Sequence, residues 1–176
     1  EAFMYRFHPQ ILKVAEIIKN KEIGNITSMK SYFGKDILSK KNIFGFKRKK
    51  KLDANNRLFS KKLGGGAILD LGCYPVSFSI FIASLITEGS FKEFKISNKK
   101  KEIGTTDVDL DSYAEIKFEN NFKSYIGASF TKNLGKKTEI NGKNGKIIIE
   151  DTWHGSPSKI WVINKNNKKE IKFETN

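Results

Sequence analysis

The chain is organised around the stretch Leu63-Gly64-Gly65-Gly66-Ala67-Ile68-Leu69-Asp70-Leu71-Gly72-Cys73-Tyr74-Pro75. Three consecutive glycines lead into an apolar segment that carries one carboxylate, Asp70, and a tyrosine four positions later, Tyr74. Residues at positions i and i+4 share one face of an α-helix. We therefore expect an acid and a phenol to point the same way near a helix start, with the rest of the chain as their scaffold.

The apolar segment predicts a helix over residues 67–86. Pro75 has no N–H group for the Leu71 carbonyl, so this helix should kink or loosen near Gly72. Beyond Pro75 the apolar residues surround the helix, which is typical of a helix buried in a core. The uncharged run 71–86 is shorter than the ~20 residues that a membrane span needs. We expect neither a membrane segment nor a signal peptide.

Upstream of the glycines, the sequence predicts one helix, one strand and one long loop. His8 and Pro9 suit a helix start, and apolar residues at helical spacing predict a helix over residues 9–21. Residues 26–33 are rich in β-branched and aromatic side chains and predict a strand. Residues 35–62 are rich in lysine and asparagine without periodicity, so we expect a long, partly mobile loop.

Downstream of the second helix, the chain alternates short apolar runs with turns. Strands are predicted over residues 91–97, 111–119, 123–130, 136–141, 146–150, 160–163 and 169–173. Short turns between them indicate a mainly antiparallel sheet. Two helices cannot cover both faces of such a sheet, so we expect one α+β domain over residues 1–176 with helices on one face. The open face should pack on another subunit or domain.

Composition narrows the classes of partner. The chain carries a net charge of +14, but only Arg6, Arg48 and Arg57 of its 33 basic residues are arginine. Arginine is the usual reader of phosphate and guanine, so this charge indicates a lysine-rich bias rather than a nucleic-acid surface. The basic run 47–51 favours a solvated loop over a nucleic-acid contact. A single cysteine, Cys73, fits a reducing compartment, and we expect a cytoplasmic location.

The residues at the glycine turn allow two interpretations. The glycines either form a tight loop or let a ligand approach a helix N-terminus, which favours anions. Asp70 either complements the helix dipole or acts chemically, and Tyr74 is either a core aromatic or a general acid–base. The second role needs a cation that lowers the tyrosine pKa from about 10. His8 favours a capping role, and two histidines with one cysteine do not make a metal site.

Two segments together resemble the C-terminal domain of the glucose–fructose oxidoreductase/inositol dehydrogenase (Gfo/Idh/MocA) family. They are residues 1–10 and 64–75, about fifty residues apart. Tyrosine at position 74, where histidine is commoner, is similar to the branch that holds dimeric dihydrodiol dehydrogenase, xylose dehydrogenase and glucose–fructose oxidoreductase. Residues 128–131 and 139–147 also resemble the sheet region of the family.

This resemblance implies the C-terminal half of an NAD(P)-dependent oxidoreductase acting on a CH–OH group of a sugar or diol. In the family, an N-terminal Rossmann domain binds NAD or NADP and ends in a Glu-Lys-Pro motif with a catalytic lysine. Neither element is present in this sequence. The remaining domain binds the substrate and forms homo-oligomers through its open sheet face. A non-enzymatic domain that associates through the same sheet is the alternative.

The resemblance also assigns roles to residues. Asp70 and Tyr74 match the catalytic acid and the general acid–base of hydride transfer, with the absent lysine lowering the tyrosine pKa. Arg6, His8 and Arg57 match positions near the substrate. By the same resemblance, Gly65 and Gly66 bring the helix start close to the nicotinamide, and no metal is implied.

Overall fold

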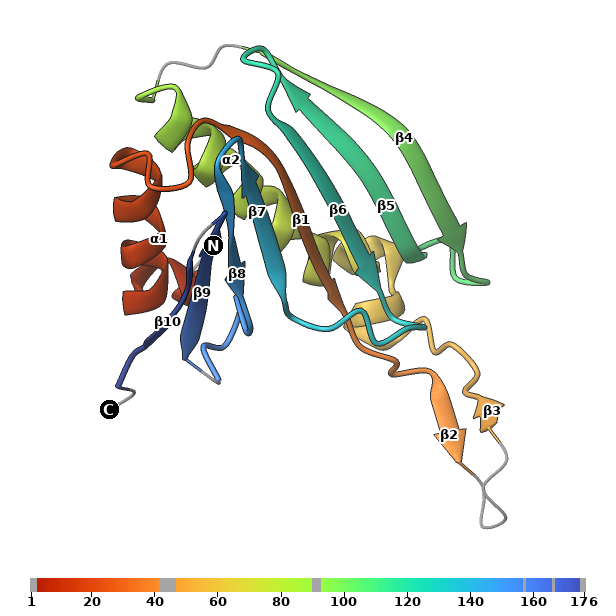
Figure 1. Cartoon of the computed structure of the whole chain (residues 1–176). Helices are drawn as coiled ribbons and strands as arrows, with labels where there is room; N and C mark the ends of the chain where they lie inside the picture. Colours follow the sequence, from red (N-terminus) through yellow and green to blue (C-terminus); the bar gives the residue numbers. More distant parts are fainter. Residues whose placement is uncertain (1–2, 42–46, 90–92, 157, 166, 175–176) are drawn as a thin grey trace.

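A computed structural model describes residues 3–41, 47–89, 93–156, 158–165 and 167–174 (Figure 1). Its centre is an eight-stranded sheet in the order β10-β9-β8-β7-β1-β6-β5-β4. The strands are β1 Ile26–Gly34, β4 Phe94–Ile103, β5 Asp109–Phe118, β6 Lys123–Ser129, β7 Thr138–Gly142, β8 Gly145–Ile149, β9 Lys159–Asn164 and β10 Asn167–Lys172. Only the β1–β6 pair within this sheet is parallel. The predicted mainly antiparallel α+β fold is confirmed.

Two helices, α1 (Pro9–Lys19) and α2 (Cys73–Ile86), lie on the same face of the sheet (Figure 1). The α1 helix begins as its sequence predicts, because the His8 Nδ1 atom accepts the Gln10 N–H at 3.3 Å and Pro9 occupies the first helical position. Its apolar stripe, which includes Ile11, Val14 and Ile17, is fully buried. Both helices therefore face one core, and the other face of the sheet stays open.

The core lies between the helices and the sheet. The side chains of Phe78 and Ile82 on α2 are completely buried against strand residues such as Met29 and Ile140. The helical stretch Lys61–Ile86 has the length and hydropathy of a membrane span. Here its innermost side chains belong to the protein core, as expected for a helix that is apolar on most sides.

The predicted irregular loop over residues 35–62 contains more structure than its sequence indicates. Strands β2 (Ser39–Lys41) and β3 (Lys47–Lys49) pair antiparallel, and short 3₁₀ helices cover Arg57–Phe59 and Lys61–Leu63. Residues 42–46 lie outside the described part of the chain. Leu38 and Phe59 of this segment join a second apolar cluster beside Phe130. Two buried side chains anchor a stretch whose lysine content suggested a loop.

The predicted strand over residues 91–97 begins later and runs further than expected. Residues 90–92 lie outside the description, and β4 covers Phe94–Ile103. The strand continues past a bulge at Asn98, whose φ of 50° marks the irregularity, into a lysine run. Charged side chains are common on edge strands, where they discourage pairing with other chains. The lysine run of β4, whose composition is typical of a solvated loop, thus forms the edge of the sheet.

Candidate functional site

The glycine turn is shaped by close backbone contacts. The Gly64, Gly65 and Gly66 N–H groups donate to the carbonyls of Lys61, Ser60 and Leu58 at 3.2, 2.9 and 2.9 Å. A Cβ atom on Gly65 would lie 2.7 Å from the Leu58 carbonyl oxygen, and Gly66 has a φ of 118°. These glycines are required by local packing. Their N–H groups have protein partners, so the turn offers close approach rather than an anion cradle.

Asp109 at the start of β5 caps the helical segment that follows the turn. Its Oδ2 atom accepts the Ile68 N–H at 2.9 Å and the Ser112 hydroxyl at 2.7 Å. A carboxylate there complements the positive end of the helix dipole. The sequence analysis missed this residue because Asp109 is 41 positions from Ile68. No local spacing connects the two.

The predicted weakness before Pro75 takes the form of a π-helical turn over Ile68–Gly72, which continues into α2. Asp70 lies in this wide turn. Its Oδ1 atom accepts a hydrogen bond from Arg57 Nη1 at 3.0 Å. The Arg57 side chain is 73% exposed, whereas that of Asp70 is 21% exposed. The structure therefore brings together two of the predicted site residues, a partly buried acid and an exposed cation.

Tyr74 begins α2 and packs into an aromatic cluster. Its ring centroid lies 5.4 to 6.2 Å from those of four other rings, which belong to Phe3, Phe33, Trp153 and Tyr5. The contacts with Phe3 and Phe33 are edge-on, at interplanar angles of 77° and 86°. The half-buried Tyr74 ring is thus held by segments that are far apart in the sequence.

Asp151 positions the Trp153 side of this cluster. Its Oδ1 atom accepts the Trp153 and His154 N–H groups at 3.1 and 2.9 Å, and its Oδ2 atom pairs with Lys136 Nζ at 3.0 Å. The Trp153 indole N–H donates to the Tyr32 carbonyl at 3.1 Å. Burial alone would raise the pKa of Asp151, but the His154 N–H and Lys136 outweigh burial and hold this pKa below its usual value.

This carboxylate predicts a pH dependence of stability. Because the folded-state pKa of Asp151 lies below its unfolded value near 4, its stabilising contribution is present at neutral pH. The contribution is lost as the pH falls below about 4. The Lys136→Met variant should lower the free energy of unfolding at pH 7 by about 1 kcal/mol. It should also flatten the acid dependence measured by urea unfolding at a series of pH values.

Lys137→Met is the matched control for this variant. Lys137 is adjacent in sequence, but it pairs with the more exposed Glu150 at 3.6 Å. Its loss should leave both the stability and its pH dependence nearly unchanged. Equal effects of the two variants would contradict the role given to the Asp151 pair.

Arg6 and His8 each contact other residues of the protein. The Arg6 guanidinium donates to the Ser77 hydroxyl at 3.0 Å and lies 5.8 Å from the centroid of the Phe81 ring, about one and two helical turns beyond Tyr74 on α2. His8 caps α1, and its Nε2 atom is 3.5 Å from the Ser158 hydroxyl. The predicted capping role of His8 is confirmed. Substrate contact by Arg6, His8 or Arg57 stays a prediction.

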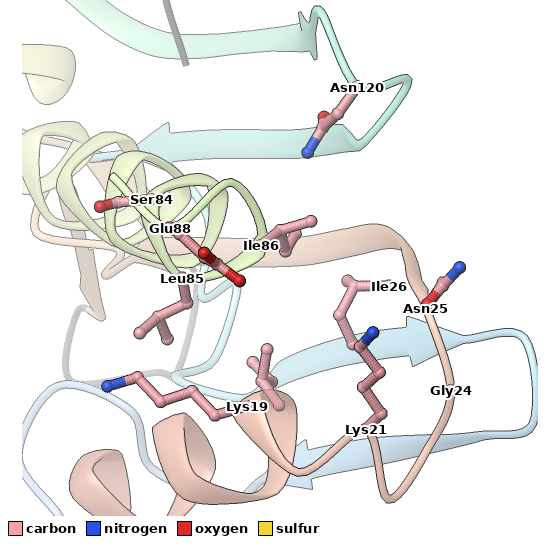
Figure 2. Close-up of a pocket in the computed structure, with 11 residues that line it drawn as sticks. Lys19, Lys21, Gly24, Asn25, Ile26, Ser84, Leu85, Ile86, Glu88 and Asn120 are labelled. Atoms are coloured by element: carbon pink, nitrogen blue, oxygen red, sulfur yellow. The ribbon is translucent and has the colours of Figure 1, made fainter. Parts of the chain in front are cut away.

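A cavity of about 810 Å³, lined by described residues, is at the other end of α2 (Figure 2). Ser84 and Leu85 of α2 line it together with Lys19 and Lys21. This cavity is remote from Tyr74, which lies in the first turn of the helix. Within the described residues, no group of three or more His, Cys, Asp or Glu side chains is arranged to hold a metal ion.

The chain is similar in sequence to known dehydrogenases. It is 27% identical over 176 residues to trans-1,2-dihydrobenzene-1,2-diol dehydrogenase from Xenopus tropicalis, covering 99% of this chain and 46% of that protein. It is 34% identical over 77 residues to D-xylose 1-dehydrogenase (NADP(+)) 2 from Haloferax volcanii, covering 44% of this chain and 19% of that protein. The chain thus spans at most about half the length of these curated relatives.

Solved structures share the fold. A mutant 3-ketoreductase from Actinomadura kijaniata, in complex with TDP-benzene and NADP, superposes with a TM-score of 0.75 at 18% identity, over 98% of this chain and 48% of that one. Aldose-aldose oxidoreductase from Caulobacter crescentus gives 0.75 at 13% identity, over 99% and 48%. A sequence model of the GFO/IDH/MocA C-terminal domain matches residues 11–148. The chain therefore belongs to the Gfo/Idh/MocA family of oxidoreductases, in which it corresponds to the C-terminal domain.

Proposed function

We propose that this chain is the substrate-binding and catalytic half of an NAD(P)-dependent oxidoreductase that acts on a CH–OH group of a sugar or diol. The observation that carries the proposal is the family match over residues 11–148, within which Asp70 lies in the π-helical turn before α2 and Tyr74 lies in the first turn of α2. The diol and xylose dehydrogenases among its relatives support this class of substrate. A Rossmann domain of the parent protein is the proposed partner.

The surface near Asp70 fits a nicotinamide ring but not a pyrophosphate. Leu63 and Leu69 flank the glycine turn and are 63% and 61% exposed, so they offer apolar surface to a flat ring. The glycine N–H groups already donate to protein carbonyls and are not free for phosphate oxygens. NAD or NADP would be held mainly by the partner domain, and it supplies the hydride acceptor or donor when bound.

In the proposed reaction, the Tyr74 phenolate oxygen takes the proton of the substrate hydroxyl and becomes the phenol, while the carbon that bears this hydroxyl loses a hydride and becomes a carbonyl carbon. The four rings around Tyr74 fix the direction of its phenol and keep the neighbouring space apolar. Asp70, with its carboxylate aligned by Arg57, orients the substrate hydroxyl. A cation from the partner domain would favour the phenolate form of Tyr74.

The experiment that tests this function uses the parent protein and the isolated chain side by side. Cofactor reduction is followed with NAD or NADP and a panel containing trans-1,2-dihydrobenzene-1,2-diol and D-xylose. The parent should turn over at least one diol or aldose, whereas the isolated chain should neither turn over nor bind the dinucleotide tightly. Tight dinucleotide binding by the isolated chain, or an inactive parent across the panel, would contradict the proposal.

The open sheet face favours a second role, self-association. Tyr32, Tyr113 and Tyr125 lie together there, and the rings of Tyr32 and Tyr113 cover Gly127, whose missing side chain leaves them room. Burial raises the pKa of Tyr32 above its ordinary value, and the neighbouring tyrosines add to this rise. The Tyr32 phenol therefore stays uncharged at neutral pH, as suits a side chain in an interface between two copies.

Tyr125→Glu tests this association, because it places a carboxylate among the tyrosines of the open face. Light scattering over a range of concentrations should show a dimer for the wild type and a monomer for the variant, with unchanged circular dichroism. Lys95→Glu, at the edge of the same face, is the control and should remain dimeric. A wild type that is monomeric throughout would remove this role.

A further inference from the structure

A second, apolar cavity lies between α2 and the edge strand β4, on the helix-bearing side of the sheet. It has a volume of about 490 Å³. Its lining includes Val76 and Ile80 of α2, Phe94 and Ile96 of β4, and Ile116 and Ile126 of the two strands beyond. Val76 is two positions from Tyr74, about 200° around the helix. The cavity and the Tyr74 cluster therefore lie on opposite sides of α2.

The walls of this cavity are exposed although they are apolar. Phe94, Ile96 and Ile80 are 49%, 50% and 38% exposed, and they gather around a single hollow. Exposed apolar side chains are ordinary when they are scattered, but a contiguous group marks a binding surface. The volume falls within the range of small-molecule sites. The cavity has the size and polarity of a site for an aliphatic group.

Positive charge lies at one end of the cavity. Lys99, Lys100 and Lys101 also line it. The strand register places Lys101 opposite Ser112, and Ser112 faces the start of α2 through its bond to Asp109. Among the ion pairs formed by described residues, none involves these three lysines. The cavity thus joins an apolar interior to a cationic rim without an acidic partner.

We propose that this cavity binds a small amphipathic anion, with its aliphatic chain between α2 and β4 and its acidic head group at Lys99 and Lys101. Each methylene that enters an apolar site contributes favourably to binding, whereas the head group stays at the solvent edge with the ammonium groups. Charge complementarity decides against a cationic or neutral amphiphile. The site borders the π-helical turn of Asp70 through Ile68 but lies on the other side of α2 from Tyr74, and it does not depend on the proposed dehydrogenase function.

The test is a titration of the protein with decanoate below its micelle concentration, followed by NMR of isoleucine δ-methyl groups. The methyl signals of Ile80, Ile96 and Ile116 should shift in a saturable way. Those of Ile11 and Ile160, buried elsewhere in the core, should not. Octanoate should bind about tenfold more weakly because it has two methylenes fewer. Decyl sulfate should compete, since it shares the chain and the sign of charge.

The variants separate the head-group contact from general charge. Lys99→Met with Lys101→Met should weaken decanoate binding about five- to tenfold. The control variant combines Lys95→Met on β4 with Lys117→Met on β5. It removes the same charge from the opposite face of the sheet and should have little effect on decanoate binding. Equal loss in both pairs, equal binding of decyltrimethylammonium, or the absence of saturable methyl shifts would each overturn the proposal.

Discussion

Tyr74→Phe in the proposed NAD(P)-dependent parent protein is expected to lower kcat by about 10²- to 10⁴-fold, the range typical for loss of a general acid–base. The substitution removes only the phenol oxygen. The ring would keep its contacts with Phe3, Phe33 and Trp153, so folding and substrate binding should change little. Steady-state kinetics with the preferred diol or aldose measure the effect, and a thermal melt verifies that the fold is intact.

Tyr125→Phe is the control, because Tyr125 lies on the open face of the sheet, away from α2. It should retain wild-type turnover. Asp70→Asn should lower kcat less than Tyr74→Phe, since Asp70 only orients the hydroxyl in the proposed reaction. If Tyr74→Phe keeps near-wild-type kcat, Tyr74 has no part in proton transfer. The aromatic cluster would then be purely structural.

The fold was largely predictable where a periodic pattern reports burial directly. The α1 helix has a capping histidine, a proline at its first position and one apolar stripe, and all three signals agree. In β6, the predicted strand over residues 123–130, Ser124 and Ile126 are buried between the half-exposed Lys123 and Tyr125, whereas Gly127, Ala128 and Ser129 are all buried. The extent of β4 was wrong because its lysines are exposed on an edge strand, where burial imposes no pattern.

The site was predictable only in part, because the residues that hold it in place are far in sequence from Asp70 and Tyr74. Asp70, Arg57 and Tyr74 are named by local motif and family resemblance. Asp109 and Asp151 reach the site through the order of strands in the sheet, which no spacing within the sequence reveals. Asp109 and Asp151 act in the same way, because each carboxylate accepts at least one backbone N–H group. Asp109 fixes the start of the helical segment at Ile68, and Asp151 fixes the segment that bears the Trp153 ring.

Trp153 is the most deeply buried of the four rings that contact Tyr74. It is 1% exposed and contacts Tyr5, Phe33, Tyr74 and Phe78. Trp153→Ala should therefore lower the free energy of unfolding by about 3–5 kcal/mol, the usual cost of a large cavity in a core. Urea unfolding followed by circular dichroism measures this loss.

A milder variant keeps the experiment informative if Trp153→Ala does not fold, since a whole domain is stable by only about 5–15 kcal/mol. Trp153→Phe retains a ring but loses the N–H that donates to the Tyr32 carbonyl, so it should cost about 1–2 kcal/mol. In the parent protein it should also lower kcat more than it changes KM, because the smaller ring at position 153 holds the Tyr74 ring less firmly. An unchanged kcat would show that Trp153 serves stability alone.

The second tryptophan supplies the matched control. Trp161 lies on β9 beneath the ammonium groups of Lys159 and Lys168, at 5.3 and 4.3 Å from its ring. These contacts are near the surface, so Trp161→Ala should cost only about 1–2 kcal/mol and leave kcat unchanged. Comparable losses for the two tryptophans would contradict the special position of Trp153. A large loss for Trp153 alone would tie the stability of the sheet to the ring that orients the proposed acid–base.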